Sequence, residues 1–126
     1  MEVCSSGIFA ENGEFASYNA IEVMKLNDID LKYHRSTNIV DSNILEMDLI
    51  LCATISHKVS VMHMYPEIKE KVYTMKEYAE CIGENRDYDI KDPWGYNLDT
   101  FLSCAEETKM CIDKTIDKIK SVNNHL

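Results

Sequence analysis

An acidic residue, an aromatic residue and a glycine stand close together in the segment Asp92-Pro93-Trp94-Gly95-Tyr96-Asn97. Pro93 fixes its own φ and favours an extended conformation for Asp92. Gly95 lets the chain turn where a Cβ would clash. The carboxyl group is then held beside an aromatic side chain, and such an acid can protonate a leaving group. The alternative is an ordinary turn with a solvated aspartate, and the segment alone does not exclude it.

Five further segments accompany this one, in an order and spacing that resemble the low-molecular-weight protein-tyrosine-phosphatase family over nearly the whole chain. They are Ser5-Ser6-Gly7, the stretch from Asp28-Ile29-Asp30-Leu31 to His34, Met47 to Thr54, Ser56-His57-Lys58, and Lys71 to Tyr78. The glycine after Trp94 resembles the bacterial branch of the family, which includes protein-arginine phosphatases. The resemblance implies hydrolysis of a phosphomonoester through a cysteinyl-phosphate, with Asp92 as the general acid. It also makes Trp94, and more weakly Tyr96, the aromatic wall of the substrate pocket.

The phosphate-binding loop of that family is a nucleophilic cysteine, five residues and an arginine, and this sequence contains no such loop. The two arginines are Arg35 and Arg86. Six positions after the five cysteines stand Ala10, Lys58, Asp87, Met110 and Asp117. Cys52 to Lys58 is the nearest imitation, but Cys52 ends an apolar run and lysine lacks the two-pronged donor of arginine. We therefore expect Cys52 to be a buried strand thiol and the chain to be inactive by itself.

Two polar residues match family positions beneath the phosphate loop. The resemblance implies that Ser5 and His34 belong to a hydrogen-bond network that supports this loop. The ordinary alternatives are a strand hydroxyl and a surface imidazole. The first residues, Met1 to Cys4, resemble sequence from the middle of a protein. We therefore expect an N-terminally incomplete chain that lacks the family's first strand, its loop and its first helix.

Length and composition predict one globular domain over residues 1–126, with 45% hydrophobic and 28% charged residues. A net charge of −9 without a basic cluster argues against nucleic-acid binding. No apolar stretch approaches the ~20 residues that span a bilayer, so we expect no membrane contact. Scattered cysteines and histidines predict reduced thiols in the cytoplasm, no metal and no cofactor. The expected partner is a phosphorylated protein or a small phosphomonoester, if the loop is supplied.

Strands that alternate with helices predict an α/β domain with a parallel sheet, and the resemblance implies three layers. The expected strands are 2–8, 47–53 and 72–75, and the expected helices are 17–28, 41–46, 56–65, 76–80 and 97–121. Ser17 and Asp41 are the expected caps of the first two helices, and Pro66 is expected to stop the third. Helical spacing predicts that the last helix buries Phe101, Cys104, Ala105, Thr108, Cys111, Ile112, Thr115, Ile116 and Ile119. We expect Cys104 and Cys111 to be core residues without a redox role. The resemblance implies the strand order 2-1-3-4, with the absent first strand in the interior of the sheet.

The loss of an interior strand exposes unpaired backbone groups and predicts an unstable, rearranged or self-associating chain. Three hypotheses about function stay open. The chain is an inactive member of the phosphatase family, a non-catalytic module that binds a partner or itself through the exposed sheet edge, or an enzyme that receives its loop from another chain. Phosphotyrosine and phosphoarginine both remain possible substrates.

Overall fold

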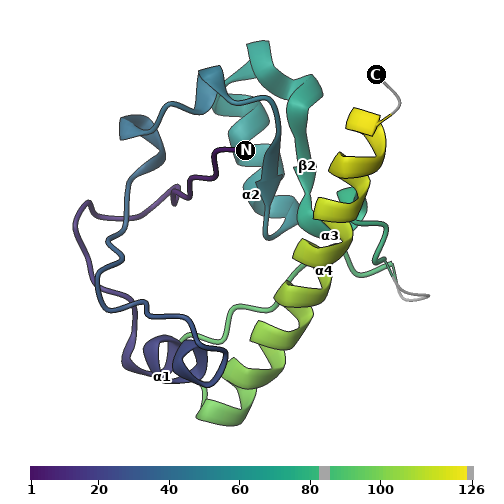
Figure 1. Ribbon diagram of the computed structural model, residues 1–126. Coiled ribbons are helices and arrows are strands. Elements are labelled where there is room, and N and C mark those ends of the chain that lie inside the picture. The colour runs from purple at the N-terminus through teal and green to yellow at the C-terminus, as the bar shows by residue number, and fades with distance from the viewer. Residues whose placement is uncertain (83–85, 125–126) are drawn as a thin grey trace.

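The computed structural model describes residues 1–82 and 86–124, and it contains two short parallel strands surrounded by helices (Figure 1). The helices are α1 (Tyr18–Leu26), α2 (Ile55–Met64), α3 (Met75–Tyr78) and α4 (Leu98–Asn124). The 3-10 turns are η1 (Ile39–Asp41), η2 (Ile44–Glu46) and η3 (Pro66–Lys71), and the strands are β1 (Ile50–Cys52) and β2 (Val72–Thr74).

The strands pair in parallel, and α2 lies between them in the chain. Ile50 pairs with Val72, Leu51 with Tyr73 and Cys52 with Thr74. Within the described residues, neither strand has a second neighbour. The alternation of strand and helix predicted from sequence is confirmed here. Among the described residues, no strand pairs with the outer edge of β1.

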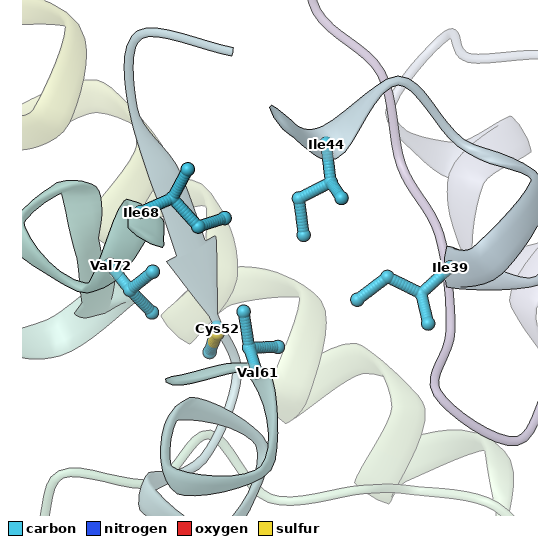
Figure 2. Close-up of a cluster of buried hydrophobic side chains, with 6 residues drawn as sticks. All are labelled: Ile39, Ile44, Cys52, Val61, Ile68 and Val72. Carbon is cyan, nitrogen blue, oxygen red and sulfur yellow. The ribbon is translucent and has the colours of Figure 1, made fainter. Parts of the chain in front are cut away.

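A small core joins this strand pair to the two 3-10 turns that precede it. Figure 2 shows Ile39 and Ile44 directed across the core towards side chains from β1, β2, α2 and η3. The buried set comprises Ile39, Ile44, Cys52, Val61, Ile68 and Val72. These apolar contacts hold residues 39–46 against the strand pair.

Helix α1 lies far from the strand pair and packs on α4 (Figure 1). The Ser17 hydroxyl accepts a hydrogen bond from the Ala20 N–H, which caps α1 as the sequence predicts. Val23 is the buried residue of this helix. The rest of the N-terminal half forms a wide arc that leaves the neighbourhood of α2, reaches α1 and returns to β1 (Figure 1).

The predicted strand over residues 2–8 is wrong. Only a single parallel bridge joins Gly7 to Asn38. In it the Gly7 N–H donates to the Thr37 carbonyl at 2.9 Å, and the Ile39 N–H donates to the Gly7 carbonyl at 3.0 Å. A strand needs a partner along its length, and the described residues supply none here.

Three local predictions also need correction. Asp41 does not cap a helix over 41–46, because it ends η1 and the Asn38 side chain caps that turn by accepting from the Val40 N–H. Helix α2 begins one residue before Ser56, at Ile55. Ile112 does not lie on the inner face of α4, because it is 42% exposed. The long helix itself is confirmed, and Phe101, Cys111 and Thr115 are buried on it.

Candidate functional site

The Asp92 segment forms a tight turn that uses its proline and its glycine. The Tyr96 N–H donates to the Pro93 carbonyl at 2.9 Å, and Gly95 has a φ of 82°, in the left-handed region. Oδ1 of Asp92 accepts a hydrogen bond from the Trp94 N–H at 3.0 Å. This bond orients the carboxyl group, whose side chain remains exposed to solvent. The turn therefore presents an oriented and accessible acid.

Contacts from two helices hold this turn in place. The Asn97 carboxamide oxygen accepts hydrogen bonds from the N–H and the hydroxyl of Thr100, both at 3.0 Å, and so caps α4. Asn19 on α1 donates its side-chain N–H to the Tyr96 carbonyl at 3.4 Å. The Lys91 ammonium lies 4.6 Å from the centre of the Tyr96 ring. No motif in the sequence points to Asn19 or Lys91, and the Asn19 contact joins positions too far apart in the chain for a local pattern to reveal.

The two aromatic residues lie in the same turn as Asp92, but they do not enclose it. Trp94 is 78% exposed and Tyr96 is 55% exposed. An open depression of about 390 Å³ lies beside the turn, and its lining includes Lys91, Asn97 and Glu107. Charges of both signs line this hollow, so it does not form a phosphate cradle. The role of Trp94 and Tyr96 as a substrate wall stays a prediction.

Ser5 and His34 lie on the exposed N-terminal arc and not beside Asp92. Both side chains are exposed, and neither makes a hydrogen bond to another described residue. The backbone carbonyl of His34 accepts from Arg35, whose guanidinium lies 3.5 Å from the centre of the Phe15 ring. Ser5 and His34 are predicted to support a phosphate loop. The described residues do not include such a loop, so this role also stays a prediction.

The Cys52–Lys58 pair does not imitate the phosphate loop. Cys52 is 6% exposed, and burial raises the pKa of its thiol to about 11, with Lys58 opposing and Glu77 adding to the shift. The Lys58 ammonium forms a salt bridge with Oε1 of Glu77 at 2.5 Å. The Glu77 carboxylate also accepts a hydrogen bond from the Thr74 N–H in a capping box. A thiol with such a pKa is neutral at pH 7 and a poor nucleophile. The prediction that Cys52 is a buried strand thiol is confirmed.

The sequence predicts only that Lys76 lies in a helical turn, without a specific role. Its side chain is nearly buried, and its ammonium lies 3.4 Å from Glu107 and 3.8 Å from Asp87. The described part of the chain holds no group of three or more histidine, cysteine and acidic side chains arranged to bind a metal. None of its helices is long and apolar enough to cross a membrane.

Known proteins of similar sequence and structure are phosphatases. The family described as low molecular weight phosphotyrosine protein phosphatase matches residues 1–124. A protein-arginine-phosphatase from Geobacillus stearothermophilus is 31% identical over 121 residues, which cover 96% of this chain and 78% of that protein. The solved structure of the YwlE arginine phosphatase from the same species has a TM-score of 0.88 at 30% identity, covering 98% of this chain and 77% of that chain. The low molecular weight protein tyrosine phosphatase from T. tengcongensis has a TM-score of 0.80 at 37% identity, covering 91% and 76%.

Proposed function

Because this chain belongs to the low molecular weight phosphotyrosine protein phosphatase family, we propose that it supplies the general acid of a protein phosphatase whose phosphate loop lies outside these 126 residues. The observation that carries the proposal is the Asp92 turn, where a hydrogen bond from the Trp94 N–H orients an exposed carboxyl group. In the covalent mechanism of this family, such an acid protonates the leaving group and then takes a proton from the attacking water. The substrate is a phosphorylated protein side chain.

The same residues cannot complete the reaction by themselves. The sequence contains no cysteine followed six positions later by arginine, and the nearest substitute has a buried, neutral thiol. Without loop amides and arginine, nothing stabilises the equatorial oxygens of the transition state. The chain alone is therefore inactive in this proposal. A relative and a solved structure from Geobacillus stearothermophilus are named arginine phosphatases, whereas the T. tengcongensis structure is named a tyrosine phosphatase, so phosphoarginine and phosphotyrosine are both candidate substrates.

The test supplies the loop in trans. A peptide carrying the family's strand and Cys-x5-Arg loop is added to the chain, and hydrolysis of phosphoarginine and phosphotyrosine peptides is measured. We expect activity only in the mixture, and Asp92→Asn should lower it about 100-fold or more, because general acids contribute about 10²–10⁴-fold. Asp99→Asn is the matched control, since it removes another exposed acid near the turn. Equal activity of the two variants would contradict the role of Asp92.

A second function, binding without catalysis, is favoured by the strand pair itself. The sheet has two strands among the described residues, so the outer edge of β1 is free to pair with another chain. Phe9 and Val3 on the N-terminal arc are large apolar side chains that stay mostly exposed. Sedimentation equilibrium over a range of concentrations tests self-association directly. A monomer that unfolds cooperatively at every concentration would exclude self-association and leave a different partner as the occupant of the edge.

A further inference from the structure

The chain passes the N-terminus of α2 just before it reaches the Asp92 turn (Figure 1). Oδ1 of Asp89 accepts a hydrogen bond at 2.8 Å from the N–H of Ile55, the first residue of α2. The Ile90 N–H donates to the Ala53 carbonyl, also at 2.8 Å. The side chain of Ile90 is buried. Two consecutive residues ahead of the turn are thus attached to the junction between β1 and α2.

A carboxylate is well suited to the place that Asp89 occupies. The first N–H groups of a helix have no partner within the helix, and they form the positive end of its dipole. Oγ1 of Thr54, the N-cap of α2, accepts from the His57 N–H at 3.0 Å. The Ile55 N–H lies two residues earlier and is satisfied from a position 34 residues away. Asp89 therefore completes the cap of α2 from a distant part of the chain.

Asp89 is itself held from the side of α3. Its N–H donates to Oδ1 of Asp87 at 3.0 Å. Oδ2 of Asp87 lies 3.8 Å from the ammonium of the buried Lys76 on α3. The backbone of Asp89 is thus fixed by a contact that leads to α3, and its side chain by a contact with α2.

The Asp92 turn lies between this attachment and a second one. The bond from the Trp94 N–H orients the Asp92 carboxyl group only relative to the turn itself. On the far side of the turn, the Tyr96 carbonyl is bound to α1. On the near side, Asp89 fixes the turn beside Ala53, which directly follows β1. The carboxyl ends of parallel strands are where α/β proteins bind their ligands. The attachment therefore decides whether the acid reaches that edge.

We propose that Asp89 is a positioning residue, which holds the turn that carries Asp92 at the carboxyl end of β1. Asp89 acts through the backbone between the two residues and not on the reacting atoms. The catalytic part of this proposal rests on the function proposed above for Asp92. The attachment itself belongs to the chain alone and is measured without any activity.

Amide hydrogen exchange, followed by NMR on the whole chain, tests the attachment. We expect the Ile55 amide of the wild type to be protected. In Asp89→Ala the amides of Ile55 and Trp94 should exchange about tenfold faster, the factor that a hydrogen bond to a charged group contributes. Asp89→Asn keeps an oxygen acceptor and should restore part of the protection. Asp99→Ala is the matched control, because it removes a carboxylate from the first turn of another helix, α4. The amide of the buried Cys111 reports unfolding of the whole chain.

Three exchange results would overturn the proposal. One is an unprotected Ile55 amide in the wild type, a measurement that needs no substitution. Another is equal exchange of the Ile55 and Trp94 amides in Asp89→Ala and Asp99→Ala. The third is an equal acceleration of the Cys111 amide, because Asp89 would then support the whole fold rather than the turn.

Activity of the mixture with the loop peptide tests the catalytic part. Asp89→Ala should lower kcat about 10- to 100-fold with KM nearly unchanged, because a misplaced catalytic group costs up to about that factor. The same substitution should cost little more in a chain that already carries Asp92→Asn, since the two residues act as a unit. A full additional loss in that double variant would contradict the positioning role. If the wild-type mixture is inactive, the function proposed for Asp92 fails, and the exchange measurements still decide whether Asp89 holds the turn.

Discussion

Replacing Cys52 with valine should make the chain more resistant to alkaline pH. Burial in the core between β1 and α2 raises the pKa of the Cys52 thiol from 9.0 to about 11. The folded state therefore keeps a proton that the unfolded state loses between these two values. Stability from this residue is complete below pH 9 and falls as the pH rises towards 11. Valine has no proton to lose, and it suits a strand position in an apolar core.

The size of the effect follows from the two pKa values. A difference of one unit corresponds to about 1.4 kcal/mol, so the free energy of unfolding should fall by about 2 kcal/mol between about pH 8 and about pH 10.5. Urea unfolding of wild type and Cys52→Val at both pH values measures this quantity. Tyrosine and lysine residues also titrate in this range, but they are common to both proteins and cancel in the difference. Cys4→Ser is the control, because Cys4 is exposed.

Equal alkaline losses in the wild type and Cys52→Val would refute the reasoning. They would mean that the fold accepts the Cys52 thiolate at little cost. Cys52 and Lys58 would then return as a possible nucleophile and cation pair, despite the short contact between Lys58 and Glu77. The rate of alkylation of Cys52 in the folded chain at neutral pH is an independent check. We expect it to be slower than that of the exposed Cys4.

Three further substitutions test individual interactions and one backbone conformation of the fold. Burial alone would raise the pKa of Glu77, but hydrogen bonds from Lys58 and the Thr74 N–H lower it, so this stability is lost as the pH falls. Glu77→Gln should therefore lower the free energy of unfolding by about 1–2 kcal/mol at pH 7 and by less near pH 4, as measured in urea. Among the described residues, the buried Thr115 hydroxyl has no hydrogen-bond partner, so Thr115→Val should raise stability by about 1 kcal/mol, and an unchanged midpoint would contradict this. Gly95→Ala should cost ~1 kcal/mol because Gly95 has a φ of 82°, and a smaller loss for Gly95→Asn in thermal unfolding would support the cause.

Patterns within a few consecutive turns were predicted correctly from the sequence. The Ser17 cap, the stop of α2 before Pro66 and the long amphipathic α4 depend on neighbours in the chain. The same holds for the Asp92 turn, because Pro93 and Gly95 restrict their own backbones. The order of motifs along the chain also carried the family resemblance, which the match over residues 1–124 confirms.

Pairings between distant segments were not predictable in this way. The segment 2–8 has a strand-like composition, but a strand forms only where a second strand supplies hydrogen bonds. Among the residues that the structure describes, this segment forms one bridge, to Asn38. The ion pair of the buried Lys76 with the partly exposed Glu107 joins residues that no periodic pattern relates, and so does the contact of Asn19 with Tyr96. Each depends on how α1 and α3 pack on α4.

The sequence by itself thus determined that an acidic residue, Asp92, lies in a turn set by its neighbours. It also determined that these 126 residues contain no Cys-x5-Arg motif. Only the tertiary structure decided which thiols are buried and which carboxylates meet lysines. The physical reason is that turns and caps arise from bonds between near neighbours in the chain. Burial and charge pairing arise from contacts that exist only after distant segments have packed together.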